Sequence, residues 1–140
     1  MKIYLTIMLV FTFVLSQAQE ERLLPALTVN NKGAAIQISY QQIYTEGDFN
    51  FGPRVGLIYH PLNTAWNNFY WQNIIEYKGF FISPFWLRSY DKTIGYQIPT
   101  SLGYIAKTKI ANIEVWGNYV MHARTFDVQI IIVPNIKTRL

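Results

Sequence analysis

Five charged side chains fall well inside segments that are predicted below to be strands, whereas most other charges lie in turns or at segment ends. They are Arg54, Glu76, Arg88, Glu114 and Asp127. Two are positive and three are negative, and an unpaired buried charge is costly, so we expect them to pair in a closed interior. Such a set could line a path for an ion or solute, or form a salt-bridged plug. The narrow interior of a small barrel favours the structural plug.

Nucleophilic catalysis would need a histidine beside a hydroxyl group and a carboxylate. The chain has two histidines, His60 and His122, and the nearest candidate partners are Ser83, Ser89 and Asp91. The sequence contains no Gly-x-Ser-x-Gly elbow and no phosphate-binding loop. We therefore expect no catalytic residue, although the enzyme question stays open.

Metal, cofactor and nucleic-acid chemistry find little support in the composition. There is no cysteine, which excludes disulfides, thiolate metal sites and a lipoprotein anchor, and no cluster of histidines and carboxylates suggests a metal site. The formal net charge is +4, without a basic run or stripe, so nucleic-acid binding is not supported. We expect no cofactor and no metal.

The elements that carry these residues are predicted to be strands. No segment keeps a helical period, whereas alternation with period two recurs along the chain, for example over 49–60 and 111–121. We expect eight antiparallel strands joined by turns, at about 22–30, 33–44, 49–60, 67–78, 80–91, 94–107, 109–122 and 125–133. Pro53, Pro84 and Pro99 fall within them and predict either bulges or an open sheet.

Alternation leaves open which face is buried. A soluble sandwich or barrel would turn the apolar face inward, and an outer-membrane barrel would turn it outward. Only 14% of residues are charged, against roughly 25% in a typical soluble domain. Many tyrosines and tryptophans near strand ends also resemble an interfacial girdle; we take these to be Tyr40, Tyr44, Tyr59, Trp66, Tyr70, Trp71, Tyr77, Tyr90, Tyr96, Tyr104 and Tyr119. Both observations favour the membrane.

The first segment is expected to lie outside the fold. Lys2 precedes an apolar run over 3–15, and small residues at 16 and 18 suggest a cleavage site after Ala18. The run is shorter than the roughly 20 apolar residues of a spanning helix. We interpret residues 1–18 as a secretory signal peptide and residues 19–140 as one β-barrel domain.

Over nearly all of residues 22–133 the chain resembles the small eight-stranded outer-membrane β-barrels of Gram-negative bacteria, of the OmpA-transmembrane-domain and OmpX type. The resemblance rests on strand count, alternation and the sorting of charges. It implies an all-β, antiparallel up-and-down transmembrane barrel in the cell outer membrane, in contact with membrane lipid. The implied role is structural or in surface interaction, without catalysis, around a plugged polar lumen.

Two alternatives stay open. One is a soluble periplasmic or secreted β-barrel or sandwich that binds an apolar ligand. The other is a lipid-modifying barrel enzyme, although the deacylase pattern of a histidine two positions before a serine is absent, since Ala123 and Arg124 follow His122. The membrane interpretation requires an outward orientation of Val55, Leu57, Ile113, Val115, Val128 and Ile130.

Overall fold

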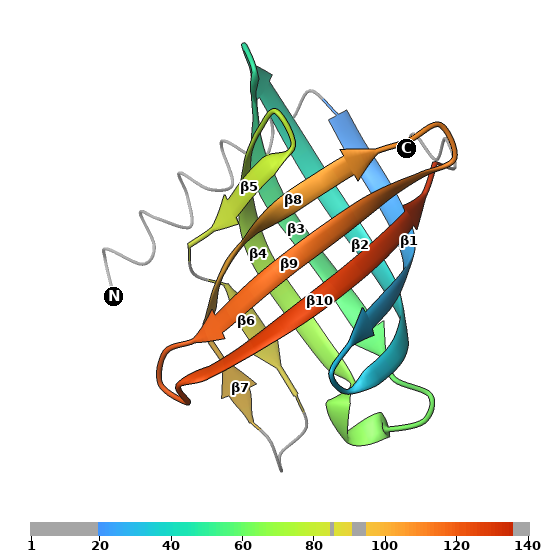
Figure 1. The fold of residues 1–140 in the computed structure, drawn as a ribbon, viewed down its shortest axis with the longest axis vertical. Helices are drawn as coiled ribbons and strands as arrows, with labels where there is room; N and C mark the ends of the chain where they lie inside the picture. The colour runs from blue at the N-terminus through green and yellow to red at the C-terminus, as the bar shows by residue number, and fades with distance from the viewer. Residues whose placement is uncertain (1–19, 85, 91–94, 136–140) are drawn as a thin grey trace.

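The fold is built from antiparallel strands, shown in Figure 1. The structure is a computed structural model that describes residues 20–84, 86–90 and 95–135. Its strands are β1 (Glu20–Asn30), β2 (Gly33–Glu46), β3 (Phe49–Tyr59), β4 (Asn68–Tyr77), β5 (Phe80–Ser83), β6 (Leu87–Ser89), β7 (Tyr96–Gln97), β8 (Pro99–Lys107), β9 (Ala111–Val120) and β10 (Thr125–Pro134). One 3-10 turn, η1 (Thr64–Trp66), lies between β3 and β4. In the described part of the chain, no helix has the length and apolar character needed to cross a membrane.

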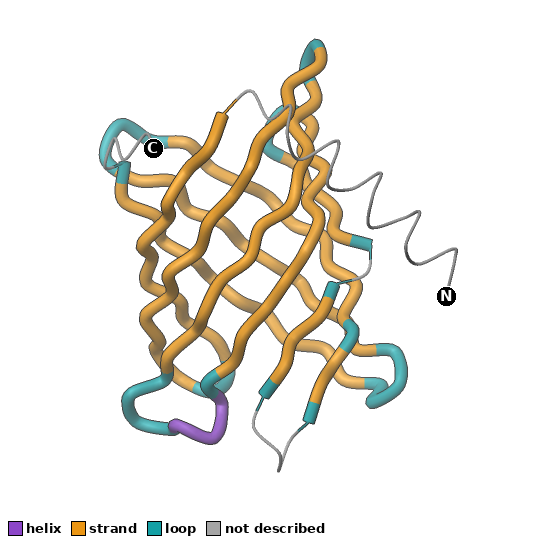
Figure 2. The backbone as a smooth tube through the Cα atoms, turned by 180° about the vertical axis from the view of Figure 1, so that it is seen from behind, coloured by secondary structure: helices purple, strands orange, loops and turns teal. Residues whose placement is uncertain are grey.

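The sheet closes on itself into a barrel, so the open-sheet alternative is wrong. Each strand from β1 to β4 pairs with the next, β5 and β8 continue the sheet, and β9 and β10 lead back to β1. The short strands β5 and β6 lie one after the other along β4 and together take the place of the fifth strand. Strands β7 and β8 take the sixth place, which makes the closed, eight-stranded antiparallel barrel predicted from the alternation (Figures 1 and 2).

The two ends of the barrel differ in what they hold. We call one the terminal end, because β1 begins and β10 ends there, together with the turns β2–β3, β4–β5 and β8–β9. The other, the loop end, holds the β1–β2 turn, the η1 segment, the β9–β10 turn, the end of β6 and the start of β7 (Figure 2). The interior side chains meet different surroundings at these two ends.

The fifth and sixth strands were predicted to be continuous, and this is wrong. Pro84 lies in the break after β5, and Pro99 is the first residue of β8. Proline has no N–H to donate to a ladder, so regular pairing stops near both residues. The backbone N–H of Trp86 donates to the carbonyl of Pro99 at 3.1 Å, and the hydroxyl of Thr100 donates to the carbonyl of Pro84. These bonds tie the two interrupted strands together.

The alternation places apolar side chains on the outside of the barrel. The side chains used above to separate the two architectures face outward: Leu57, Ile113, Val115, Val128 and Ile130 are exposed, and Val55 is half-buried on the same face of β3. Leu57 is 61% exposed. On the outward positions of the described strands, the only charges are Glu21 and Glu46, both near the terminal end. A protein core formed by these apolar residues is therefore excluded.

Outward aromatic residues gather toward both ends. At the terminal end, Tyr44 stacks on Phe51 with ring centroids 5.5 Å apart, Phe49 meets Tyr77 at 4.8 Å, and Phe80 meets Tyr104 at 5.0 Å. Toward the loop end the exposed rings are Tyr59, Phe69, Tyr96, Tyr119 and Phe126. The girdle prediction is wrong for Tyr70, which is buried inside the barrel, and for Trp66 and Tyr90, which line an interior cavity.

Candidate functional site

The centre of the lumen is crossed by a buried ion pair between Arg54 and Glu114. Arg54 lies on β3 and Glu114 on β9, four places away in the ring of eight strands, so they reach across the barrel. Arg54 Nη1 donates to Glu114 Oε2 at 2.8 Å, and Nη2 donates to Oε1 at 3.0 Å. Both side chains are almost fully buried. This two-bond geometry is the strongest and most directional arrangement for a guanidinium and a carboxylate.

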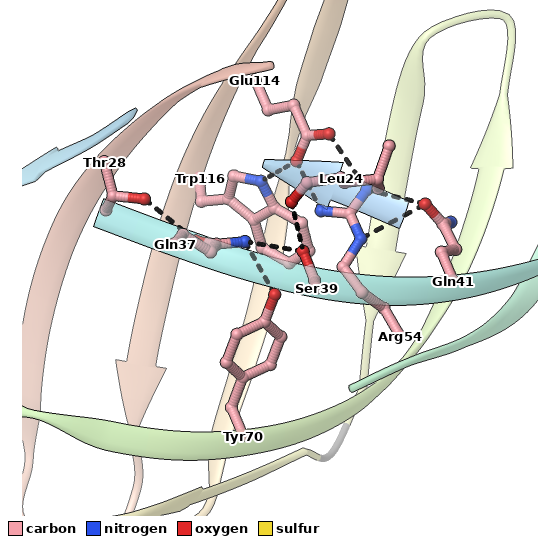
Figure 3. A network of polar contacts seen from close by, with 9 residues as sticks. All are labelled: Leu24, Thr28, Gln37, Ser39, Gln41, Arg54, Tyr70, Glu114 and Trp116. Carbon is pink, nitrogen blue, oxygen red and sulfur yellow. Dashed lines mark hydrogen bonds and ion pairs between the residues drawn. The ribbon is translucent and has the colours of Figure 1, made fainter. Parts of the chain in front are cut away.

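Neighbouring groups complete the hydrogen bonding of this pair, as Figure 3 shows. The indole Nε1 of Trp116 donates to Glu114 Oε2 at 2.9 Å. Arg54 Nη2 and Nε also donate to Gln41 Oε1, at 3.0 and 3.3 Å. Buried charges need such extra partners to offset the loss of hydration, and here both charges have them.

A chain of neutral hydrogen bonds runs beside the ion pair and joins β1, β2 and β4 (Figure 3). The Thr28 hydroxyl donates to Gln37 Oε1 at 2.9 Å. The Gln37 amide donates to the Tyr70 hydroxyl at 2.7 Å and to Ser39 Oγ at 3.3 Å. Because these residues are buried, the network adds a second polar tie across the interior.

Aromatic rings fill the space between these polar groups. Phe81 lies 4.0 Å from Trp116, Trp86 lies 6.4 Å from Trp116, and Tyr70 lies 6.1 Å from Trp86, measured between ring centroids. The inward face of Gly103 makes room for them, since a Cβ atom there would lie 2.6 Å from the Phe81 ring. The cavity left in this region measures only about 10 Å³. We call these four rings the aromatic plug.

On the terminal side of the plug, the lumen has a small cavity of about 90 Å³. Besides Arg54 and Glu114, its walls carry the pair of Lys107 Nζ with Glu76 Oε1 at 2.8 Å, and the pair of Arg22 with Glu20 at 2.7 Å. The charges that line this cavity are therefore matched one to one.

Beyond the plug, the loop end has a larger cavity of about 280 Å³. Arg88 Nη1 donates to Asp127 Oδ1 at 3.4 Å, and Asp127 Oδ2 accepts from the Asn118 amide at 3.0 Å. Lys32 Nζ lies 4.1 Å from the centroid of the Trp66 ring. Burial lowers the pKa of His60, which follows β3 and also lines this cavity, so His60 is neutral at pH 7.

The structure places all five sequence-predicted charges on the interior side but divides them among three places. Arg54 pairs with Glu114, Arg88 with Asp127, and Glu76 with Lys107. Lys107 is one of the charges at segment ends, and its pairing with Glu76 depends on the register of β8 against its neighbours. Asn68, also buried in the interior, was not predicted as a site residue, whereas His60 was considered only as a catalytic histidine and Tyr70 only as a girdle residue.

The candidate catalytic residues do not come together in the described chain. His60 and Ser83 are buried, and the atoms His60 Nδ1 and Ser83 Oγ have no hydrogen-bond partner among the described residues. His122 and Ser89 are exposed, and Asp91 lies outside the described residues. Within the same ranges no group of three histidines, cysteines or carboxylates is placed to hold a metal ion.

The fold and interior define a class of protein: a closed, eight-stranded antiparallel β-barrel with apolar side chains outside and a lumen filled by polar and aromatic groups. No protein-family model, curated protein or solved structure matches the chain.

Proposed function

We propose that this protein is an outer-membrane β-barrel similar in architecture to the small barrels of the OmpA-transmembrane-domain and OmpX type, with a non-enzymatic structural or surface-interaction role. The observation that carries the proposal is the apolar exterior. Large apolar side chains are exposed on strands all around the barrel, among them Leu57, Leu102 and Val128. Monomeric soluble proteins rarely expose continuous apolar patches larger than a few hundred Å², whereas a lipid-facing surface requires them.

The aromatic residues agree with this environment. Exposed rings such as Phe80 and Tyr104 gather toward the terminal end, and Tyr59 and Tyr119 lie toward the other. Aromatic girdles of this kind mark the two interfaces of membrane barrels. Most strands have 9 to 14 residues, and roughly 9–11 tilted residues cross a bilayer.

The closed lumen supports a structural role over transport. The Arg54–Glu114 pair and the aromatic plug leave about 10 Å³ in the middle of the barrel. The soluble alternative has less support, because an apolar ligand would need an apolar interior, whereas the interior here carries ion pairs and amides. Since membrane barrels place their short turns in the periplasm, the terminal end would face the periplasm and the loop end the outside.

Fractionation combined with heat-modifiable gel mobility tests this function. We expect the full chain to stay in the envelope membrane after a high-salt and urea wash, and to leave it only with detergent. Unheated and boiled samples should then migrate differently, because a closed barrel resists unfolding by cold dodecyl sulfate. Recovery of the folded protein in the soluble fraction without detergent would contradict the proposal.

A further inference from the structure

The larger cavity, at the loop end, contains three buried polar atoms that lack partners among the described residues. They are His60 Nδ1, Asn68 Oδ1 and Arg88 Nη2. The three residues that carry these atoms are 2%, 8% and 7% exposed, respectively. Since most buried polar groups in proteins are hydrogen-bonded, three unpaired atoms on the wall of one cavity require an explanation.

Strand pairing brings these residues to one side of the cavity. Asn68 on β4 lies opposite Ile58 on β3, two residues before His60. Arg88 on β6 lies opposite Tyr70, two residues after Asn68. Adjacent strands are about 4.8 Å apart, so three consecutive strands present the unpaired atoms to the same small volume.

The chemistry of the three atoms defines what would satisfy them. Arg88 Nη2 is a charged donor, so it needs an acceptor, and an anionic oxygen is the strongest one. The Asn68 amide N–H donates to the carbonyl of Trp66 at 3.1 Å. This bond fixes the amide orientation, because a carbonyl only accepts, and it leaves Oδ1 in need of a donor. His60 Nδ1 can accept or donate, according to its tautomer.

The net charge and the lining of the loop-end cavity both favour a small anionic ligand. The titratable groups that line the cavity are Lys32, His60, Arg88, Tyr90 and Asp127. The formal charges of Lys32 and Arg88 face that of Asp127, which leaves a surplus of one positive charge. Trp66 and Tyr90, whose ring centroids are 5.6 Å apart, form an aromatic wall. Apolar walls with a few placed polar groups, in about 300–1,000 Å³, are typical of small-molecule sites.

We propose that the loop-end cavity binds a small anion that also carries hydroxyl groups, of the sugar-acid or sugar-phosphate class. The anionic oxygens would accept from Arg88 Nη2, and a hydroxyl group would donate to Asn68 Oδ1. A second hydroxyl would bond to His60 Nδ1. This site is separate from the Arg54–Glu114 pair, whose polar atoms are already paired, and it does not depend on which side of a membrane the loop end faces.

Calorimetric titration of the folded full chain in detergent micelles tests the proposal, with glucuronate and glucose 6-phosphate as probes. Glucose and glucosamine are the neutral and cationic controls. We expect saturable binding of at least one anionic probe and at least tenfold weaker binding of both controls. The tighter anionic probe identifies the preferred anionic group. The side-chain ¹⁵N resonances of His60 should shift with the same probe.

Two variants that each remove one positive charge distinguish a specific binding site from general electrostatic attraction. Arg88→Gln should weaken binding roughly 10- to 100-fold, because hydrogen bonds to a charged group contribute about 1.5–3 kcal/mol. Arg124→Gln removes a positive charge from the exposed β9–β10 turn and should leave affinity unchanged. If Arg88→Gln does not fold, Asn68→Asp supplies the test. A carboxylate in place of the amide should repel the anion and weaken its binding at least tenfold.

Three results would overturn the proposal. One is the absence of saturable binding and of a His60 shift with either anionic probe. Another is binding of glucose as tight as that of the anions. The third is equal affinity in Arg88→Gln and Arg124→Gln proteins that both show the folded gel mobility.

Discussion

The two ends of the lumen are built from the same kinds of residue but differ in how completely those residues are paired. Toward the terminal end, Arg54 and Glu114 share two hydrogen bonds, and Gln41 and Trp116 supply the others. Toward the loop end, Arg88 and Asp127 meet at 3.4 Å, while Arg88 Nη2 stays unpaired among the described residues. The cavities measure about 90 and 280 Å³.

This contrast separates two uses of buried polarity. A buried ion pair with all its partners holds opposite strands together, and removing one partner leaves an uncompensated charge. Buried polar atoms without partners reduce stability instead, and we infer that they are kept at the loop end for binding. The aromatic plug lies between the two regions and keeps them apart.

The largest expected effect comes from breaking the paired end. Arg54→Met should lower the free energy of unfolding by about 3–5 kcal/mol, because it leaves Glu114 buried without its counter-ion. The double variant Arg54→Met/Glu114→Gln should recover at least half of that loss, since the glutamine still accepts from Trp116. Urea unfolding in detergent micelles, followed by tryptophan fluorescence, measures both. A loss below about 1 kcal/mol in the single variant would show that the pair does not hold the barrel closed.

The next effect tests the plug that divides the two cavities. Gly103→Ala should cost about 1–3 kcal/mol, as overpacking does in other cores, because the new methyl group meets the Phe81 ring and the carbonyl of Val115. Gly117→Ala is the matched control, since its methyl group would lie 3.2 Å from the ring of Phe126, an exposed side chain that can move. Equal unfolding midpoints for the two variants would contradict the packing described here.

At the unpaired end, the stability should depend on pH through His60. Burial lowers the pKa of His60 in the folded protein, so the unfolded chain binds the proton first as the pH falls. Stability is therefore complete above about pH 6.5 and decreases below it, by at most about 1.4 kcal/mol per pH unit for one proton. Unfolding midpoints between pH 7.5 and 5.5 should show this decrease in the wild type.

Two histidine variants identify the group responsible. His60→Gln should remove most of the decrease, because glutamine does not titrate. His122→Gln should preserve it, because His122 is exposed in the β9–β10 turn. A decrease that persists in His60→Gln would assign the pH dependence to another group.

The smallest effect compares an exposed ion pair with a buried ion pair, both of which line the terminal-end cavity. Lys107 forms an ion pair with Glu76 at 2.8 Å, but its side chain is 57% exposed. Lys107→Gln should therefore cost less than about 1 kcal/mol, far less than Arg54→Met in the same urea experiment. A comparable loss in the two variants would mean that the number of ion pairs, and not their burial, stabilises the terminal end.

Period-two alternation was sufficient to predict the barrel, the turns and the inward orientation of residues such as Glu114. It missed the interruptions of the fifth and sixth strands, because the prolines there remove backbone donors while the side-chain pattern continues. Pairings such as Arg54 with Glu114, 60 residues apart, depend on the register and closure of the whole sheet, which no local pattern encodes. Tyr70 was predicted among the outer aromatic residues because tyrosine is common both at membrane interfaces and in protein interiors. Its position in β4, between outward Phe69 and Trp71, nevertheless indicates an inward side chain.

The loop-end cavity was the least predictable feature. His60 continues the inward phase of β3, so its orientation could have been inferred from Arg54 and Ile58 on the same face. Its neighbours in the cavity come from five strands besides β3 and from three connections, and their proximity depends on the tertiary structure. The absence of partners for Asn68 Oδ1 and Arg88 Nη2 is a property of the assembled interior alone.

The most direct test of the proposal that the exterior faces lipid uses the absence of cysteine in the chain. Single cysteines at Leu57, Leu102 and Val128 on the outside, and at Gln97 in the loop-end cavity as the control, can each carry a fluorescent label in the refolded protein in vesicles. We expect lipids brominated on their acyl chains to quench the fluorescence of the three outward labels and not that of the label at Gln97. Aqueous iodide should quench the label at Gln97 and not the three outward labels. Iodide quenching of the outward labels without quenching by the brominated lipids would contradict a membrane-embedded barrel.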